Sequence, residues 1–490
     1  MNTNIRSVKY NFIMNSILTV STVLFPLITF PFATRVLGVD YYGNVSFGQS
    51  VISYFTLFSS LGIPTYGIRA CAKVRDSKEK LSQTVKELLF LNILSTIFTY
   101  IVFIWSLFCI DKFNGNMTLL LISSLSIILN TIGVQWLFSA LEQYTYITVR
   151  NIAFKIIMIF MMFVFVRGPQ DYLLYALITV FGGSASNILN YFYMWKFVDF
   201  KQTSKCNFKP HLKPIFIFFA SSAAINIYTS LDSVMLGFLT TDREVGLYTA
   251  SIRLKGALVG LVNSLGTVLL PRMSYYVEKG MKKEYTKLLT KSFNFILVIS
   301  LPIVVFFIMY AQKCLIFISG NEFSAATQSM QIIIPTLLLI GLSTTISNQI
   351  LIPHSKEHLV CLAVWISAFI DFILNLFLIP KFGAAGASLA TLIAELFSLL
   401  IQFIFTKQTV SSAIKSINYI KIGFPLIITS FVCVCFQKIA ISNLFLYLAV
   451  NTCIFFSLYI LLLLIVKEPF TLEITKPYFK KIHNLLNKSS

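Results

Sequence analysis

Charged residues are scarce in this chain. Only 12% of its 490 residues are charged, whereas 57% are hydrophobic, and the mean hydropathy is +0.80. A soluble globular protein has about 25% charged residues and could not bury so much apolar surface. The composition therefore excludes a soluble globular protein and predicts an integral membrane protein.

Cysteine and histidine are too few and too scattered for most metal or redox chemistry. The eight cysteines stand singly apart from Cys433 and Cys435, which argues against a disulfide framework. The stretch HSKEH at 354–358 fits a zinc-protease pattern, but we interpret it as a solvated turn because no third ligand is evident. We expect no metal and no cofactor, and the lack of a Walker-type glycine loop disfavours direct use of ATP.

Long apolar runs are what the chain has in abundance. A bilayer-spanning helix needs about 20 predominantly apolar residues, and fourteen runs of about that length can be placed. The sequence therefore predicts an all-α polytopic membrane protein with about 14 transmembrane helices. The expected spans are 12–32, 44–66, 88–110, 117–140, 150–166, 172–195, 215–239, 246–271, 293–312, 328–352, 359–380, 384–406, 422–440 and 443–466.

The basic residues indicate how these spans are oriented. With the N-terminus in the cytoplasm, thirty of the 39 Lys and Arg residues fall in inward segments and seven in outward ones. This is the asymmetry of the positive-inside rule, so both termini are expected in the cytoplasm. Topology and membrane lipid explain the +20 net charge, and no nucleic-acid partner is needed. The longest inward connections, 69–87 and 271–291, are expected to be amphipathic helices at the membrane surface.

Three outward turns share a pattern. Each ends in a glycine that opens the next helix, namely Gly43, Gly246 and Gly386. Spans 1 and 7 both run outward, as in a parallel repeat of two bundles around a central cavity, although glycine-rich turns also recur in unrelated membrane proteins. We expect an N-terminal lobe at 1–200, a C-terminal lobe at 201–410, and an extra helix pair with a cytoplasmic tail at 411–490.

Five charged residues stand inside the expected spans: Asp232, Arg253, Lys255, Asp371 and Glu395. An ionised side chain at the bilayer centre costs about 2.5 to 3.5 kcal/mol or more, so such residues normally face protein or a water-filled cavity. They could form buried ion pairs, for example Asp232 with Arg253. Because Arg253 and Lys255 project from different sides of one helix, a single partner does not easily serve both.

Four segments carry a resemblance to a known family: RVLGVDYYGNVSFGQSVISYFTLFSSLGIPTYGIR (35–69), QWLFSALEQYTYITVRNIAFK (135–155), LDSVMLGFLTTDREVGLYTASIRL (231–254) and DFILNLFLIPKFGAAGASLATLIAE (371–395). The chain resembles bacterial polysaccharide transporters of the O-antigen flippase (Wzx-like) type, a branch of the multidrug/oligosaccharidyl-lipid/polysaccharide exporter superfamily. The resemblance implies a non-enzymatic flippase of the bacterial inner membrane, acting in lipopolysaccharide or capsule biosynthesis. Its substrate would be an undecaprenyl-pyrophosphate-linked oligosaccharide, and a glycan polymerase and a chain-length regulator would be its partners.

The same resemblance suggests functional roles for the motif residues Arg35, Arg69, Glu142, Asp232 and Glu395. From their chemistry, Arg253 and Lys255 would attract the pyrophosphate. The stretch 224–232 offers Asn226 and Tyr228, together with Thr229 and Ser230, for contacts with sugars.

The acidic set Glu142, Asp232, Asp371 and Glu395 could instead bind a coupling proton or sodium ion. Two other functions stay open: a cation-coupled exporter of small soluble compounds, and a membrane glycan polymerase or glycosyltransferase. The polymerase or glycosyltransferase is disfavoured because no large loop is present.

Overall fold

The computed structural model describes residues 7–200, 206–436, 441–473 and 475, and these residues form helices and turns with no strand among them. This confirms the all-α membrane fold. The chain divides into two compact units between Thr249 and Ala250. The expected lobe boundary at residue 200 differs from this division, because helix α10 (Lys209–Leu239) packs against α1 and α2 of the first unit.

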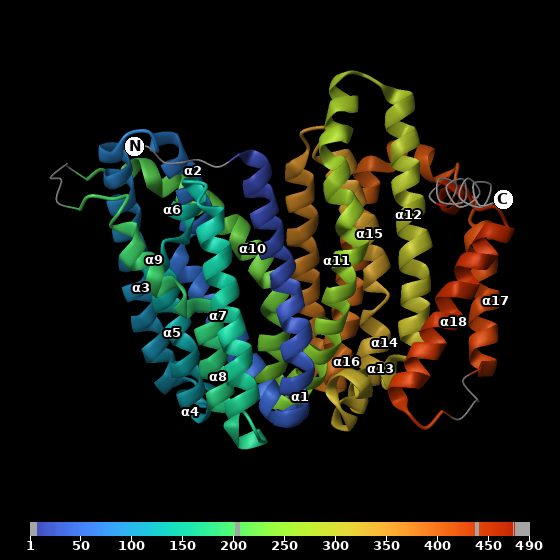
Figure 1. Ribbon diagram of the computed structural model, residues 1–490, viewed down its shortest axis with the longest axis horizontal. Helices are drawn as coiled ribbons and strands as arrows, with labels where there is room; N and C mark the ends of the chain where they lie inside the picture. Colours follow the sequence, from blue (N-terminus) through green and yellow to red (C-terminus); the bar gives the residue numbers. More distant parts are fainter. Residues whose placement is uncertain (1–6, 201–205, 437–440, 474, 476–490) are drawn as a thin grey trace, which may run out of the picture. The chain divides into compact units, whose positions relative to one another are not determined.

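The first unit contains helices that Figure 1 colours from blue to green. Short 3₁₀ and π segments, at Pro169–Asp171 and Phe181–Ala185, interrupt the path between α7 and α9. Besides α10, the helices are α1 (Val8–Ser60), α2 (Ile63–Val74), α3 (Lys78–Cys109), α4 (Asp111–Gly115), α5 (Met117–Gly133), α6 (Gln135–Ala140), α7 (Tyr144–Phe165), α8 (Tyr172–Val180) and α9 (Asn187–Met194).

The second unit begins at Ala250, within helix α11 (Asp242–Glu278), so the first residues of this helix belong to the first unit. Irregular helical turns at Asn321–Ala326 and Ser347–Leu351 flank α14 and α15. The remaining helices are α12 (Lys282–Met309), α13 (Ala311–Ser319), α14 (Thr327–Ile333), α15 (Thr336–Ile346), α16 (Glu357–Ile414), α17 (Ile420–Phe436) and α18 (Leu444–Ile465).

Two helices are long enough to hold two spans each, and a glycine breaks each of them. Gly38 interrupts α1 with φ 73° and ψ 178°, and Gly383 interrupts α16 with φ 53° and ψ −130°. Positive φ strains residues that carry a Cβ, so glycine is the natural residue at these breaks. The expected spans 12–32 and 44–66, and likewise 359–380 and 384–406, therefore fall on opposite sides of a break.

The other expected spans also fall on helices as far as the structure describes them, and residues 437–440 of the expected span 422–440 lie outside the described residues. Nine helical stretches of the described part of the chain are long and apolar enough to cross a membrane, and Met117–Gly133 and Ile420–Phe436 are shorter apolar helices. Helix α11 covers the expected span at 246–271. Large apolar side chains such as Phe98, Trp105 and Phe160 are exposed on the helix surfaces, as expected for contact with lipid.

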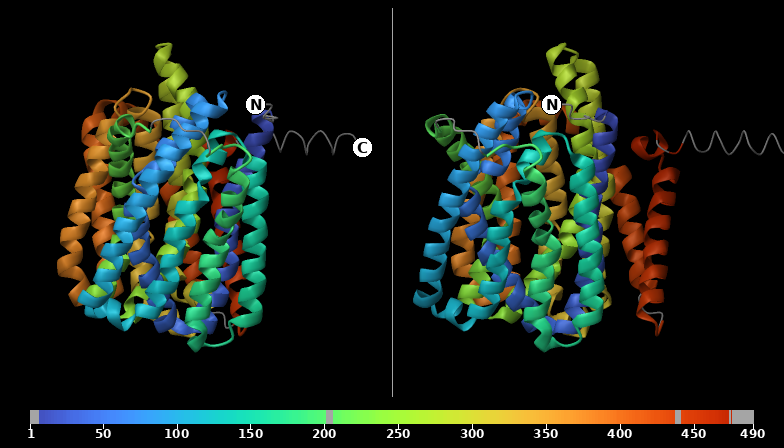
Figure 2. Two further views of the ribbon diagram at one scale, coloured as in Figure 1. Left: turned by 90° about the vertical axis from the view of Figure 1, so that its left-hand side faces the viewer. Right: turned by 60° about the vertical axis from the view of Figure 1, so that its left-hand side comes forward.

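The expectation of a separate surface helix at 271–291 is wrong. Helix α11 instead continues to Glu278, and helix α12 begins at Lys282. The two helices meet at a turn in which Gly280 has φ 66°. Figures 1 and 2 show this hairpin rising beyond the neighbouring helix ends. The polar, Lys- and Glu-rich sequence extends the helices because these residues are good helix formers.

Candidate functional site

The first unit has an open cavity of about 550 Å³ that is lined mostly by polar side chains. Residues of α1, α5, α8 and α10 and of the π-helical turn after α8 line it, and most of them carry a hydroxyl or a carboxamide. None of the described lining side chains is charged. We call this space the hydroxyl cavity.

Helical spacing explains how the polar groups gather there. Residues at i, i+4, i+7 and i+11 share one face of an α-helix. Helix α1 presents one such stripe to the cavity and helix α10 presents another, while α5 adds two serines. The residues are Gln49, Ser53, Thr56 and Ser60 on α1, Ser222, Asn226 and Thr229 on α10, and Ser123 and Ser126 on α5.

Side-chain hydrogen bonds join the walls of the hydroxyl cavity. Gln49 Nε2 donates to Thr179 Oγ1 at 3.2 Å, which links α1 to α8. Ser53 Oγ lies 3.5 Å from Asn226 Oδ1, which brings α1 and α10 together at this point of the wall. These contacts fix the polar groups within the apolar bundle.

A second cavity, of about 330 Å³, shares Thr56 and Ser60 with the first. Its lining is again largely hydroxyl and carboxamide, and it includes Asn130 and Asn187, whose side chains are 3.0 Å apart. It lies toward the C-terminal ends of α1 and α5. Under the expected topology this is the cytoplasmic end, so the two cavities form a polar path from the middle of the unit toward that end.

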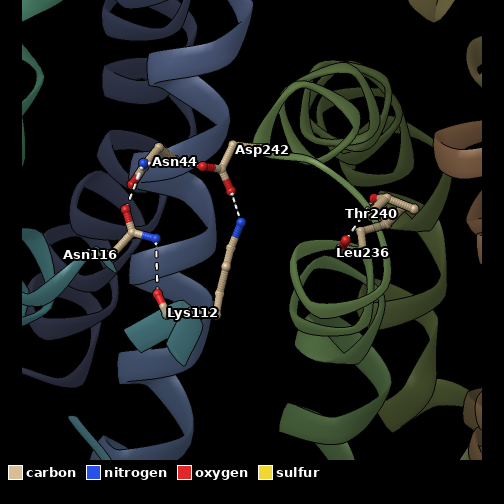
Figure 3. Close-up of polar contacts among 6 residues, drawn as sticks. All are labelled: Asn44, Lys112, Asn116, Leu236, Thr240 and Asp242. Carbon is tan, nitrogen blue, oxygen red and sulfur yellow. Dashed lines mark hydrogen bonds and ion pairs between the residues drawn. The ribbon is translucent and has the colours of Figure 1, made fainter. Parts of the chain in front are cut away.

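At the opposite end of the unit, a cluster of polar contacts ties three turns together (Figure 3). Lys112 Nζ donates to Asp242 Oδ1 at 2.6 Å. Asn44 Nδ2 donates to Asp242 Oδ2 at 3.2 Å and to Asn116 Oδ1 at 2.8 Å. We call these four residues the outer clasp, since they lie at the expected periplasmic end.

Gly43 and Gly246 lie at the same end of the first unit, inside α1 and α11 rather than at the start of a helix as expected, and they allow close backbone approach. A Cβ on Gly43 would come within 1.8 Å of the Asp242 carbonyl oxygen, and one on Gly246 within 2.3 Å of the Val39 carbonyl oxygen. The part of α1 that follows the Gly38 break therefore packs directly on the beginning of α11. Only residues without a side chain permit this contact.

Of the residues expected to bind substrate, Asn226 lines the hydroxyl cavity, and so does its neighbour Thr229. Tyr228 is half-buried on α10 and is not among the residues that line either cavity. Arg35 and Arg69 are exposed. The Arg69 guanidinium lies over the rings of Tyr66 and Phe218, at 5.7 and 5.4 Å from their centroids.

The other two expected cations, Arg253 and Lys255, lie on the part of α11 that belongs to the second unit. Arg253 is exposed and Lys255 is half-buried. Their proposed contact with pyrophosphate remains a prediction.

Glu142 pairs with a cation near the expected cytoplasmic end of the first unit. Its Oε1 accepts a hydrogen bond from Arg75 Nη1 at 2.6 Å, and Asn11 Nδ2 donates to its Oε2 at 3.3 Å. The hydrogen bond and the negative charge of Glu142 raise the pKa of Arg75. This geometry gives Glu142 a structural contact, and its role in coupling remains a prediction.

The other three acidic residues are buried. Asp232 accepts a hydrogen bond from the Tyr248 hydroxyl, and Tyr248 is fully buried. Asp371 Oδ2 accepts from Asn375 Nδ2 at 3.2 Å. Asp371 and Glu395 each lie twelve residues from the Gly383 break, so they stand at similar distances from the same turn in consecutive spans of α16.

Sequence reasoning missed most of the hydroxyl cavity, although a signal was present. Gln49, Ser53, Thr56 and Ser60 repeat at spacings of four, three and four, which marks one polar face of an otherwise apolar helix. Attention to charged residues alone overlooked these neutral ones. Among the described residues, no group of three or more His, Cys, Asp or Glu side chains could hold a metal.

Comparison with known proteins agrees with this architecture. The chain is 26% identical over 419 residues to a protein of Escherichia coli (strain K12) named as an O-antigen transporter, covering 82% of this chain and 98% of that one. Two solved structures share the fold. The lipid II flippase MurJ has a TM-score of 0.61 at 18% identity and covers 95% of this chain and all of that one. For a multidrug resistance transporter of the MATE family, the TM-score is 0.55 at 14% identity. This match covers 80% of the present chain and 96% of the transporter.

The model of one protein family, described as polysaccharide biosynthesis protein, matches residues 8–277. This match spans more than half of the 490 residues. It covers the first unit from residue 8 onward, with the hydroxyl cavity and the outer clasp, and it continues into the last turn of α11. The chain is therefore a multi-pass membrane protein that belongs to the polysaccharide biosynthesis protein family.

Proposed function

We propose that the protein is a flippase that moves undecaprenyl-pyrophosphate-linked oligosaccharide repeat units, of O-antigen or capsule type, from the cytoplasmic to the periplasmic leaflet. The observation that carries this proposal is an open cavity with an uncharged, mostly polar lining in a helical unit that also exposes many large apolar side chains. A glycan cannot enter hydrocarbon without losing its hydrogen bonds to water. The cavity offers replacement partners, while the prenyl chain stays in lipid.

Alternating access is the mechanism that we propose. At the expected periplasmic end the outer clasp holds three turns together, and the polar path extends toward the other end. Arg253 and Lys255, with Arg35 and Arg69, would attract the pyrophosphate. Asp232, Asp371, Glu395 and Glu142 would serve coupling to a proton or sodium ion, without a bound cofactor.

The cavity lining favours this function over export of small organic cations. A cation site needs a carboxylate or an aromatic cage, whereas the described lining of the hydroxyl cavity carries no charge and no aromatic ring. The relative named as an O-antigen transporter also supports a glycan substrate. We propose no catalytic step for the chain.

We further propose that the protein lies in the bacterial inner membrane with both termini in the cytoplasm, where a glycan polymerase and a chain-length regulator would act with it. Cysteine labelling should find positions 75 and 283 inside and positions 114 and 243 outside. Positions 205 and 488, also expected inside, lie outside the described residues. Labelling of 243 from the cytoplasm would contradict this topology.

Deletion of the gene in its host tests the function. We expect a lipid-linked oligosaccharide to accumulate on the cytoplasmic side, and surface polysaccharide to fall. Mass spectrometry of the lipid extract would identify the sugars. Expression of the intact gene from a plasmid should reverse both changes, whereas a deletion strain with normal surface glycan and normal lipid-linked pools would contradict the proposal.

A further inference from the structure

We infer that the hydroxyl cavity binds an uncharged segment of the glycan, so that its preferred ligand is a neutral sugar rather than an acidic one. The inference rests on the proposed function and adds the chemical class of the sugar. It concerns only the first unit, whose lining residues come from α1, α5, α8, α10 and the turn after α8.

The first step concerns what the hydroxyls offer to a ligand. Six of them donate their hydrogen to a backbone carbonyl three or four residues earlier in their own helix, at 2.7 to 3.1 Å. A hydroxyl whose hydrogen is used in this way presents acceptor lone pairs to the cavity. These are Ser53, Thr56, Ser60, Ser126, Thr179 and Thr229.

The second step matches this surface to a ligand. Sugar hydroxyls are donors as well as acceptors, so they can donate to a wall rich in acceptors. A carboxylate or phosphate only accepts, and it would meet lone pairs without a cation among the described lining residues. The carboxamides of Gln49 and Asn226 each carry donors and an acceptor, so they can both donate to and accept from sugar hydroxyls.

A third observation points to a ligand independently. The Ser123 side chain is only 2% exposed and lines the cavity, yet its hydroxyl has no hydrogen-bond partner among the described residues. Buried hydroxyls are ordinarily hydrogen-bonded. A ligand hydroxyl in the cavity would supply the partner.

The size of the cavity is consistent with a short glycan segment. Its volume of about 550 Å³ falls within the range of about 300 to 1,000 Å³ that is usual for small-molecule sites. It would hold one or a few sugar rings rather than a polymer. The second cavity continues the polar lining through Thr56 and Ser60.

The test measures binding by the full-length protein in lipid nanodiscs. Three probes are compared: a polyprenyl-pyrophosphate-linked trisaccharide of neutral hexoses, the same trisaccharide ending in a hexuronic acid, and polyprenyl pyrophosphate without sugar. We expect the neutral probe to bind at least about tenfold more tightly than the acidic one, because the acidic group finds no partner in the cavity.

Isosteric variants locate the effect. Thr56→Val and Thr179→Val each remove one hydroxyl, and each should weaken binding of the neutral probe by about 3- to 10-fold. Thr22→Val is the matched control, because Thr22 lies on the same helix α1, is exposed, and donates to its own backbone in the same way. It should leave binding unchanged. Ser126→Lys should improve binding of the acidic probe, and thermal unfolding would verify that each variant is folded.

The outcomes separate the two proposals. If the acidic probe binds as tightly as the neutral one, or Thr56→Val behaves like Thr22→Val, the inference about the hydroxyl cavity is overturned and the flippase function stands. If the sugar-free lipid binds as tightly as the neutral probe, sugar recognition by the cavity is likewise overturned. If none of the three lipids binds, the proposed function itself fails.

Discussion

Lys112 Nζ lies 2.6 Å from Asp242 Oδ1, so an ion pair joins helix α4 to the first residue of helix α11. Both side chains are about a quarter exposed, at 27% and 24%. Asn44 donates to the same carboxylate from α1. One acidic side chain therefore holds together turns that are distant in sequence.

A charge swap tests this contact. Asp242→Lys and Lys112→Asp should each lower the free energy of unfolding by about 0.5 to 1 kcal/mol, because each places like charges side by side and partial exposure limits the effect. The double variant should recover part of the loss. Unfolding of the purified protein by heat would measure both. Losses that simply add in the double variant would show that the pair contributes no coupling energy.

Gly43→Ala should disrupt the same region more strongly. The new Cβ would fall within 1.8 Å of the Asp242 carbonyl oxygen and 2.7 Å of the Gly246 nitrogen, both backbone atoms that cannot rotate away. We expect a loss of about 1 to 3 kcal/mol or more. Gly115→Ala is the control, since nothing lies within 4 Å of its added Cβ. Equal thermal stability of the two variants would contradict the close packing of these turns.

Tyr248→Phe removes the hydroxyl that donates to the buried Asp232 carboxylate. The expected cost is about 1 to 3 kcal/mol of unfolding free energy, because a buried acceptor loses a partner. Tyr41→Phe changes an exposed tyrosine and should cost little.

Asp232→Asn, and likewise Glu395→Gln, should leave membrane abundance near normal while lowering surface glycan. Normal glycan in both carboxylate variants would assign these residues to structure alone.

For Arg253 and Lys255, retained charge should matter more than retained shape. Lys255→Arg should keep most export and Arg253→Lys some of it, whereas Arg253→Gln with Lys255→Gln should lose export although fewer charges ease insertion. Surface polysaccharide would be measured beside the amount of protein in membranes. Full export by a well-inserted double variant would exclude these cations from substrate attraction.

Hydrophobic run length predicted the helices well, because a bilayer fixes both the length and the composition of a span. Where one span gives way to the next in α1 and α16, a glycine with positive φ marks the break, and the sequence placed turns in both regions. The α11–α12 hairpin was missed. Its polar residues suit a membrane surface as well as a helix that extends into water, and amphipathic pattern alone does not distinguish the two.

The candidate site was only partly predictable. Intramembrane charge drew attention to Asp232, whose partner Tyr248 lies sixteen residues away in the next helix, and no local pattern specifies that contact. Asn226 was expected to meet sugar, and it lines the hydroxyl cavity. Gln49 and Thr179 are 130 residues apart. Their meeting depends on how α1 packs against α8, which helical periodicity does not fix.

Reconstitution measures the proposed transport most directly. The purified protein would be placed in liposomes that contain a fluorescent polyprenyl-pyrophosphate-linked neutral oligosaccharide, and a membrane-impermeant quencher would report the label that reaches the outer leaflet. We expect transbilayer movement well above that of protein-free liposomes, with a lower rate for Thr56→Val and an unchanged rate for Thr22→Val. Movement no faster than in protein-free liposomes, from protein shown to be folded, would contradict the flippase function.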